Sequence, residues 1–245
     1  ARPAEVSRVA AARSLRTVFT GGAGALRVGI PAAGLTRVIG GPALDALRAT
    51  GVDVRLGVRA RALEFADGRF TAAETSQGRI EADAFVAALP FPALGPILPP
   101  DLREAPLVRG WSALRPSPIL NVHLFYDRPV EAPLFAAALG GRTQWIFNTT
   151  RLRGAPPETP GQLSLVVSGA VEETAWPRER TVATLSEEVR RLIPAAREAA
   201  VARWYVLKER AATFVPDAAA EAARPSFATP WPNLFLAGAW PATGW

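Results

Sequence analysis

The spacing of apolar residues predicts two helices and a strand in the N-terminal quarter of the chain. Residues 1–20 carry apolar side chains at helical intervals among charged ones. Residues 42–50 form a second helical pattern, with proline in its first turn and Gly51 as its stop. Residues 52–56 then alternate between apolar and polar, which is typical of a half-buried strand.

A β-meander and a buried strand are predicted next. The three extended pieces of the meander are residues 58–65, 70–75 and 80–84. The turns between them are Asp67-Gly68 and Gln77-Gly78. Residues 85–89 are continuously apolar, as in a parallel strand buried on both faces, and Pro90 ends the run.

The second half of the chain reads as a Pro-rich crossing segment, residues 90–118, followed by strands and one long helix. The helix covers residues 181–192, which are apolar along one face, and Pro194 ends it. The predicted strands are residues 119–126, 145–148, 163–168, 201–207 and 234–237.

The strand at residues 119–126 separates its side chains into two sets. Alternation puts Asn121, His123 and Phe125 on one face and the apolar residues between them on the other.

Composition removes several classes of enzyme. The 245 residues contain no Cys and one His, His123, which excludes disulfides, thiolate metal sites and multi-His metal sites. No G-x-S-x-G elbow of a serine hydrolase is present. With 49% hydrophobic residues the chain can bury one core or two smaller ones. Because Met is absent, we expect a fragment that is cut at both ends.

The net charge of +6 does not indicate a nucleic-acid partner. The arginines are scattered and mixed with Asp and Glu, whereas a nucleic-acid interface favours a basic stripe with interleaved aromatic residues. No apolar run approaches the ~20 residues that span a bilayer. We expect a cytoplasmic protein that can make a peripheral contact with the membrane.

A glycine-rich run nearly matches a dinucleotide-binding turn. Gly22 and Gly24 fit G-x-G, but Arg27 stands where the third glycine belongs, and the run follows a helical segment where the motif requires a strand. We interpret it as a loop.

Several longer segments are informative as a set. These segments are GLTRVIGGPALDALRATGVDVRLGVRARALEFADGRF, ADAFVAALPFPALGPILP, LRPSPILNVHLFYDRPV, QWIFNTT, YVLKERAATFVP and PNLFLAGAWPATGW. In this order they resemble flavin amine oxidases and phytoene desaturases, and within that superfamily the hydroxysqualene dehydroxylases of hopanoid biosynthesis.

The resemblance implies an α/β fold built from a partial Rossmann-like FAD-binding domain and a substrate domain with a mixed or antiparallel sheet and helices. It assigns residues 1–22 to a substrate-domain helix, 23–100 and 229–245 to the FAD-binding domain, and 101–228 to the substrate domain. The implied reaction is reductive dehydroxylation of a lipophilic isoprenoid, in which reduced FAD delivers hydride to an allylic alcohol and squalene forms.

The resemblance also implies site residues. Asn121 stands where amine oxidases present a Lys toward the flavin, and His123 is its neighbour on the same face, so both are candidate catalytic residues. Either could instead be a hydrogen-bonding residue of the core. The implied cofactor-binding residues are Ala60, Leu89, Pro90, Gly238, Ala239, Trp240, Thr243 and Gly244.

Other residues receive a structural interpretation. Ala60 could also be an ordinary strand residue, and residues 238–244 an ordinary strand-to-helix turn. Lys208 is interpreted as a surface charge, and Trp145 and Trp204 as core residues.

Two departures from the family pattern leave alternatives open. The closing motif is usually L-A-G-D-W-T-x-T-G-W, and here Ala239 replaces the Asp and Pro241 a Thr. The G-x-G-x-x-G turn that holds the pyrophosphate is also missing, so we expect the chain alone to be inactive and free of flavin. The alternatives are a carotenoid desaturase, an amine oxidase, or a flavin-free remnant or lipid-binding scaffold. The oligomeric state is left open.

Overall fold

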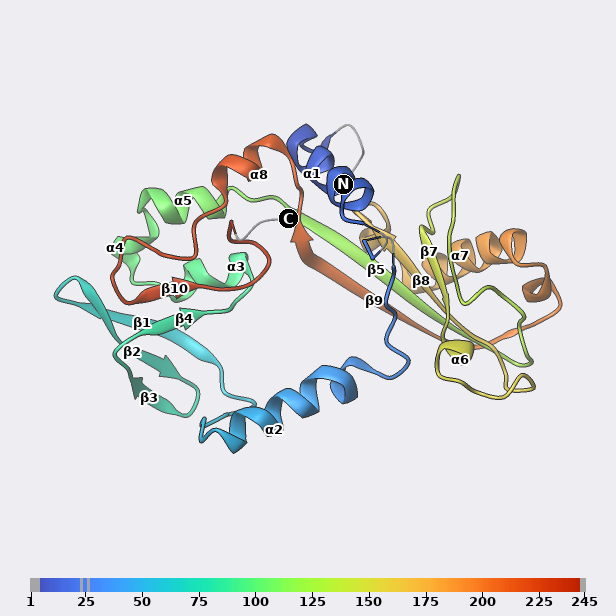
Figure 1. The fold of residues 1–245 in the computed structure, drawn as a ribbon, viewed down its shortest axis with the longest axis horizontal. Helices are drawn as coiled ribbons and strands as arrows, with labels where there is room; N and C mark the ends of the chain where they lie inside the picture. The colour runs from blue at the N-terminus through green and yellow to red at the C-terminus, as the bar shows by residue number, and fades with distance from the viewer. Residues whose placement is uncertain (1–4, 23, 26, 243–245) are drawn as a thin grey trace. The chain divides into compact units, whose positions relative to one another are not determined.

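The computed structural model describes residues 5–22, 24–25 and 27–242, which form two compact units (Figure 1). Each unit has its own hydrophobic core. Unit 1 comprises Ala1–Leu26, Asp53–Arg115 and Phe214–Trp245, and unit 2 comprises Arg27–Val52 and Pro116–Thr213.

Unit 1 combines two small sheets with short helices. The antiparallel meander β1-β2-β3 and the parallel pair β4-β10 are separate sheets. The elements are α1 (Arg8–Thr20), β1 (Ala60–Ala66), β2 (Arg69–Thr75), β3 (Gly78–Glu81), β4 (Phe85–Ala87), α3 (Phe91–Leu94), the 3₁₀ turn Gly95–Ile97, α4 (Pro100–Arg103), α5 (Pro106–Ser112), α8 (Ala218–Ala223) and β10 (Leu234–Leu236).

The predicted meander is confirmed, and its first turn has the predicted chemistry. Asp67 and Gly68 both have positive φ, 50° and 78°, which is the backbone of the tight hairpin turn that Asp-Gly favours. The turn sets the register of β1 against β2, with Ala66 opposite Arg69.

The C-terminal strand β10 pairs in parallel with β4, so two segments far apart in sequence lie side by side (Figure 1). Asn233, just before β10, fixes this arrangement. Its buried side-chain amide accepts from the Phe70 N–H at 2.9 Å and donates to the carbonyls of Phe70, at 2.7 Å, and Asp83, at 2.9 Å. The predicted parallel strand is confirmed over Phe85–Ala87.

Unit 2 is built on a five-stranded sheet of order β6-β7-β8-β5-β9. Helix α7 covers one face, where Val182, Leu185 and Val189 join the core. The elements are the π-helical turn Thr36–Gly40, α2 (Gly41–Ala49), β5 (Pro116–Tyr126), β6 (Phe135–Ala137), β7 (Trp145–Asn148), α6 (Thr149–Leu152), β8 (Gln162–Ser168), the 3₁₀ turn Glu173–Ala175, α7 (Arg178–Leu192), the 3₁₀ turn Pro194–Arg197 and β9 (Val201–Phe214), whose last residue belongs to unit 1.

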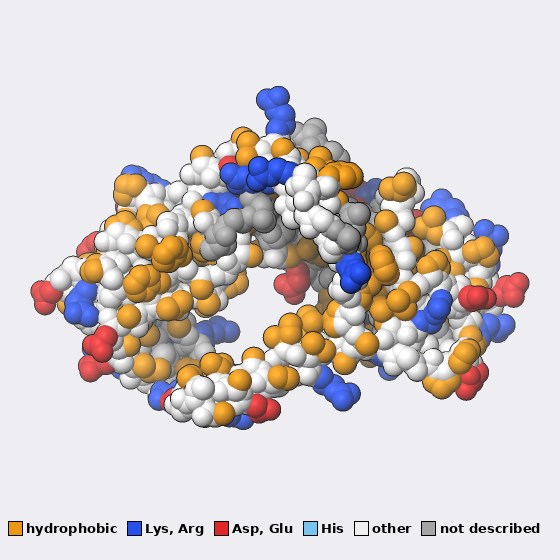
Figure 2. Space-filling model, viewed as in Figure 1, with side chains coloured by type: hydrophobic (Ala, Val, Ile, Leu, Met, Phe, Trp, Pro, Cys, Tyr) orange, Lys and Arg blue, Asp and Glu red, His pale blue; other side chains and the backbone are white. Residues whose placement is uncertain are grey.

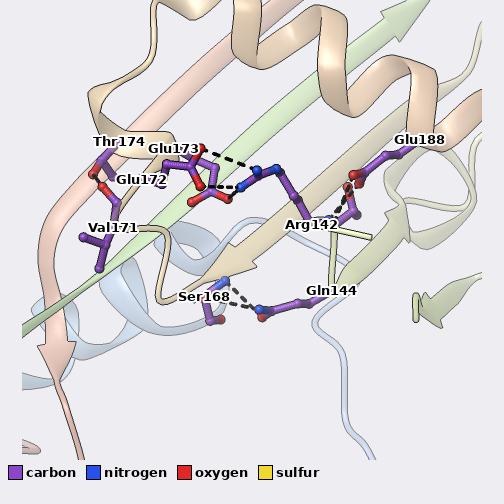
Figure 3. A network of polar contacts seen from close by, with 9 residues as sticks. Arg142, Gln144, Ser168, Val171, Glu172, Glu173, Thr174 and Glu188 are labelled. Atoms are coloured by element: carbon purple, nitrogen blue, oxygen red, sulfur yellow. Dashed lines mark hydrogen bonds and ion pairs between the residues drawn. The ribbon is translucent and has the colours of Figure 1, made fainter. Parts of the chain in front are cut away.

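A carboxylate from α7 clamps the β6–β7 hairpin (Figure 3). The buried Glu188 side chain accepts from the backbone N–H groups of Arg142 and Thr143, both at 2.9 Å. A Cβ at Gly141 would come within 3.1 Å of the carboxylate, so glycine permits this approach. The Arg142 guanidinium in turn donates to Glu172 and Glu173. The clamp therefore joins the hairpin to α7 and to the 3₁₀ turn at Glu173–Ala175.

Three sequence predictions about elements need correction. Residues 52–56 form no strand, because no described strand pairs with them, and the Val52 and Leu56 side chains are exposed. The Pro-rich crossing segment contains helices α3, α4 and α5, which use proline in their first turns. Strand β9 continues to Phe214, well past the predicted end at residue 207.

Two single-residue interpretations are also wrong. The Trp145 side chain lies on the sheet face away from the core and is 40% exposed. Lys208 is half-buried, and its ammonium donates to the carbonyls of Thr174 and Trp176. Trp204 packs against the core, as predicted.

Exposed apolar side chains remain on both units. Helix α2 buries none of its residues, and Figure 2 shows hydrophobic side chains on its visible surface. Among the described residues, none of the helices combines the length and the apolarity that crossing a bilayer requires.

Asn233→Asp should destabilise unit 1. An ionised carboxylate cannot donate to the two carbonyls that now accept from the amide, and it would place oxygen against oxygen. We expect a loss on the order of 3 kcal/mol in the free energy of unfolding, measured by chemical denaturation. Ser226→Ala, on an exposed residue nearby, should cost less than about 0.5 kcal/mol. Equal stability of the two variants would contradict the role given to Asn233.

Glu188→Gln should weaken unit 2 most near neutral pH. Burial raises the pKa of Glu188, but hydrogen bonds from Arg142 and Thr143 outweigh it and lower the pKa below its ordinary 4.5. A pKa lowered by folding stabilises the protein above the unfolded pKa, and this contribution is lost as pH falls through the folded pKa. The stability gap between wild type and E188Q should be about 2 kcal/mol near neutral pH and smaller below about pH 4.

Urea unfolding of wild type and E188Q, near neutral pH and below about pH 4, measures this difference in stability. Glu187→Gln is the matched control, because Glu187 is the exposed neighbour on the same helix. A gap that does not change with pH would contradict the charged clamp.

Candidate functional site

The carboxyl ends of β4 and β10 bring together several of the predicted cofactor-binding residues. Leu89 and Pro90 follow β4, and Gly238, Ala239 and Trp240 follow β10. The Ala237 N–H donates to the Ala87 carbonyl at 3.1 Å and extends the pairing beyond the strands. The Trp240 indole N–H donates to the Leu89 carbonyl at 2.8 Å. We call these five residues after the strands the strand-end cluster.

Within the strand-end cluster, the backbone rather than the large side chain is accessible. Trp240 is buried and packs edge-on against Trp111, with ring centroids 5.7 Å apart. Gly238 and Ala239 are exposed, and Gly238 has a φ of +123°, which strains any other residue. Ligands of open parallel sheets bind at the carboxyl ends of the strands. The exposed backbone at residues 238–239 can therefore be approached closely by a ligand.

The cluster contains part of what an FAD site needs. Ala239 has no side-chain oxygen, so it cannot make the hydrogen bonds that an Asp would make. The Gly21–Gly24 run follows helix α1, and its described residues lie outside helices and strands, as the loop interpretation predicts. The described residues thus fit a flavin ring at the strand ends, and this run does not fit its pyrophosphate.

One predicted cofactor-binding residue lies elsewhere, and two cannot be placed. Ala60 is an exposed residue of the meander, paired with Thr75, in a different sheet from the strand-end cluster. Thr243 and Gly244 lie outside the described residues.

The second candidate area is the face of the five-stranded sheet that is turned away from α7, which we call the outer face. Strand β5 divides as predicted: Leu120, Val122 and Leu124 are fully buried, while Asn121 and His123 lie half-buried on the outer face.

Register places aromatic side chains in line with both polar residues. One row across the sheet is Phe135, Phe147, Ser164 and His123, and the next is Ala137, Trp145, Val166 and Asn121. Rings of Phe135, Trp145 and Phe147 have centroids 6.4–6.5 Å apart. Sequence reasoning missed this cluster, although the alternation of Trp145 and Phe147 in QWIFNTT is a signal for it.

A second aromatic group lies on the other side of His123. The rings of Phe125 and Tyr205 meet edge to face, with centroids 5.7 Å apart. The Arg203 guanidinium lies over both rings, 4.5 Å from Phe125 and 5.4 Å from Tyr205. The outer face therefore carries aromatic rings on both sides of Asn121 and His123, which we call the polar centre.

Among the residues that the structure describes, His123 has one direct polar partner. Its Nδ1 lies 2.7 Å from Ser164 Oγ on the neighbouring strand. Burial lowers the pKa of His123, and the positive charge of Arg153 lowers it further. Arg153 is held by Gln162, at 3.0 Å. Both effects favour the neutral form of the imidazole.

A cavity of about 640 Å³ lies elsewhere in unit 2 and is separate from this polar centre. Val130, Asn148, Arg151 and Pro157 are among the residues that line it, and neither Asn121 nor His123 does. In the part of the chain that the structure describes, no group of three or more Asp, Glu or His side chains could hold a metal ion.

The outer face can bind a long apolar molecule that carries a polar group. The aromatic rings supply apolar contact area, and they can stabilise positive charge through their π faces. Asn121 and His123 supply hydrogen bonds in the middle of this surface, and His123 can also transfer a proton.

Comparison with known proteins connects these features to a family. The chain is 31% identical over 246 residues to the hydroxysqualene dehydroxylase of Rhodopseudomonas palustris, covering 99% of this chain and 54% of that protein. It is 28% identical over 167 residues to the 15-cis-phytoene desaturase of Synechococcus elongatus, covering 65% of this chain and 35% of that protein. The chain thus spans about half the length of the first relative.

A solved structure supports the fold. An oxidoreductase from Methanosarcina mazei superposes with a TM-score of 0.60 at 17% identity, covering 81% of this chain and 47% of that one. The predicted mixed fold of helices and sheets is confirmed.

The sequence profile of the flavin containing amine oxidoreductases matches residues 2–245. Since this match spans nearly the whole chain, the chain belongs to the flavin containing amine oxidoreductase family.

Proposed function

We propose that this chain is the substrate-binding and flavin-contacting part of an FAD-dependent enzyme that reductively removes a hydroxyl group from an isoprenoid, with hydroxysqualene as substrate and squalene as product. The observation that carries the proposal is a polar centre, Asn121 and His123, within an otherwise aromatic outer face. Similarity to a hydroxysqualene dehydroxylase across 99% of the chain supports the same substrate class.

Family membership confirms the expected flavin cofactor, FAD. In its reduced form FAD supplies a hydride. Leu89, Pro90, Gly238, Ala239 and Trp240 would hold the flavin at the strand ends of β4 and β10. The domain assignment that the resemblance implies is part of the proposal: residues 23–100 and 229–245 bind FAD, residues 101–228 bind the substrate, and residues 1–22 add a substrate-domain helix. These bounds describe proposed roles and differ from those of the two compact units, since Arg27–Val52 packs in unit 2.

The residues of the outer face have separate roles in the reaction. An allylic alcohol, a hydride and a proton give a hydrocarbon and water, so the leaving hydroxyl must gain a proton as its C–O bond breaks. His123 donates that proton, and Asn121 orients the hydroxyl group by a hydrogen bond. The aromatic rings exclude water and stabilise positive charge on the allylic carbon.

A phytoene-type desaturase is the second candidate, since one relative is a phytoene desaturase. Phytoene is a hydrocarbon and offers nothing for Asn121 and His123 to bond. The polar centre therefore favours an alcohol substrate. An amine oxidase is a weaker candidate because Asn121 replaces the Lys of its pattern.

We also propose a cytoplasmic location with a peripheral membrane contact, which would give the enzyme access to such a lipophilic substrate. The chain alone should lack activity, because it spans about half of its hydroxysqualene dehydroxylase relative.

His123→Ala and Asn121→Ala should each lower turnover of hydroxysqualene by about 10²–10⁴-fold in a chain extended to the length of that relative. Melting temperatures should stay close to wild type, because both side chains lie on the outer face. Turnover of the wild type should fall as pH rises through the lowered pKa of His123, since only the protonated imidazole is a strong acid. A variant that melts early but keeps its rate would contradict the catalytic role.

Ala239→Asp should tighten FAD binding in the same extended chain. The added carboxylate can accept hydrogen bonds at an exposed position of the strand-end cluster. Calorimetric titration of both versions measures the affinity, and Ala242→Asp, on an exposed residue nearby, is the control for added charge. Unchanged or weaker affinity in A239D would show that position 239 does not bind the cofactor.

A further inference from the structure

We infer that Ser164 is a positioning residue that holds the His123 imidazole by Nδ1 and leaves Nε2 as the nitrogen that meets the substrate hydroxyl. The inference rests on the proposed function for its catalytic meaning. Its geometric content is independent and can be tested separately.

The sheet register places the two residues opposite each other. His123 on β5 pairs with Ser164 on β8, and both side chains lie on the outer face. Antiparallel partners have Cβ atoms about 5 Å apart, which is within reach of a short hydroxyl side chain. The resulting Nδ1–Oγ separation is 2.7 Å.

The contact determines which imidazole nitrogen remains available. The two ring nitrogens point in different directions, so engaging Nδ1 leaves Nε2 for another partner. Among the described residues, the only hydrogen bond of the His123 ring is the one to Ser164. Nε2 is therefore the nitrogen that a ligand on the outer face can reach.

A serine at this position suits a group that must release a proton. In the neutral tautomer that we propose, the Ser164 hydroxyl donates to Nδ1 and the proton of the ring lies on Nε2. When His123 is charged, Nδ1–H donates and the same hydroxyl accepts. The contact survives both states without rotation of the ring.

A positive charge that acts on His123 comes from Arg153. Arg153 lies close enough to lower the pKa of His123, and Gln162 fixes it from β8. Arg203, from β9, lies over the ring of Phe125 two residues along β5. A carboxylate in place of Ser164 would instead stabilise the charged imidazole and make it a weaker acid.

The test uses the fact that His123 is the only histidine of the chain. In nitrogen-15 NMR of the labelled 245-residue chain, every imidazole signal belongs to this residue. We expect one dominant neutral tautomer in wild type, with the proton on Nε2, and a mixture of tautomers in Ser164→Ala. Ser164→Thr keeps the hydroxyl and should restore the wild-type spectrum, and it also serves if S164A does not fold.

Ser168→Ala is the matched control, since Ser168 lies on the same strand and the same face. It should leave the imidazole signals unchanged. In the extended, flavin-loaded chain, S164A should lower kcat by at least about tenfold with little change in KM, the scale seen for groups that orient a histidine. S164T should recover the rate.

The two ways of failing are distinguishable. If S164A leaves the tautomer as in wild type while His123→Ala is inactive, the inference about Ser164 is overturned and the proposed function stands. If S164A changes the tautomer while His123→Ala keeps full turnover, the proposed catalytic role of His123 fails and the catalytic meaning of the inference fails with it, while Ser164 still positions the imidazole.

Discussion

The two-residue repeat of β5 is the constraint on which the candidate substrate surface depends. Leu120, Val122 and Leu124 are fully buried, so a shift of one residue would expose all three and bury Asn121 and His123. The core thereby fixes which side chains reach the outer face. It also fixes the register against β8, and that register brings Ser164 to His123. The proposed catalytic geometry is in this way a consequence of apolar packing on the opposite side of the sheet.

The aromatic part of the outer face depends on a second interaction. Phe135, Trp145 and Phe147 lie on the β6–β7 hairpin, and Glu188 from α7 holds the loop between these strands. Burying a carboxylate is costly, and the two backbone N–H groups that it accepts from offset that cost. The hairpin is thus attached to the core helix, and the rings keep their register with Ser164 and Asn121.

Sequence patterns were sufficient where local chemistry determines the structure. Alternation predicted the two faces of β5, and Asp67-Gly68 predicted the hairpin, because both depend on residues close in sequence. Residues 52–56 satisfy the strand pattern but have no pairing partner among the described strands. Ser164 is 41 positions from His123, and only the pairing of β5 with β8 gives it a role. The prolines of residues 90–118 looked like linker signals, yet they begin helices.

The central claim is that the enzyme reduces an allylic alcohol. Anaerobic mixing of the extended chain, loaded with reduced FAD, with hydroxysqualene tests it most directly, followed by flavin absorbance and product analysis. The account predicts that the flavin becomes oxidised as squalene forms in equal amount, and that a saturated alcohol of the same length gives no reaction. Reduced flavin that is unchanged by hydroxysqualene, in a protein whose oxidised flavin is reduced by phytoene, would contradict the account.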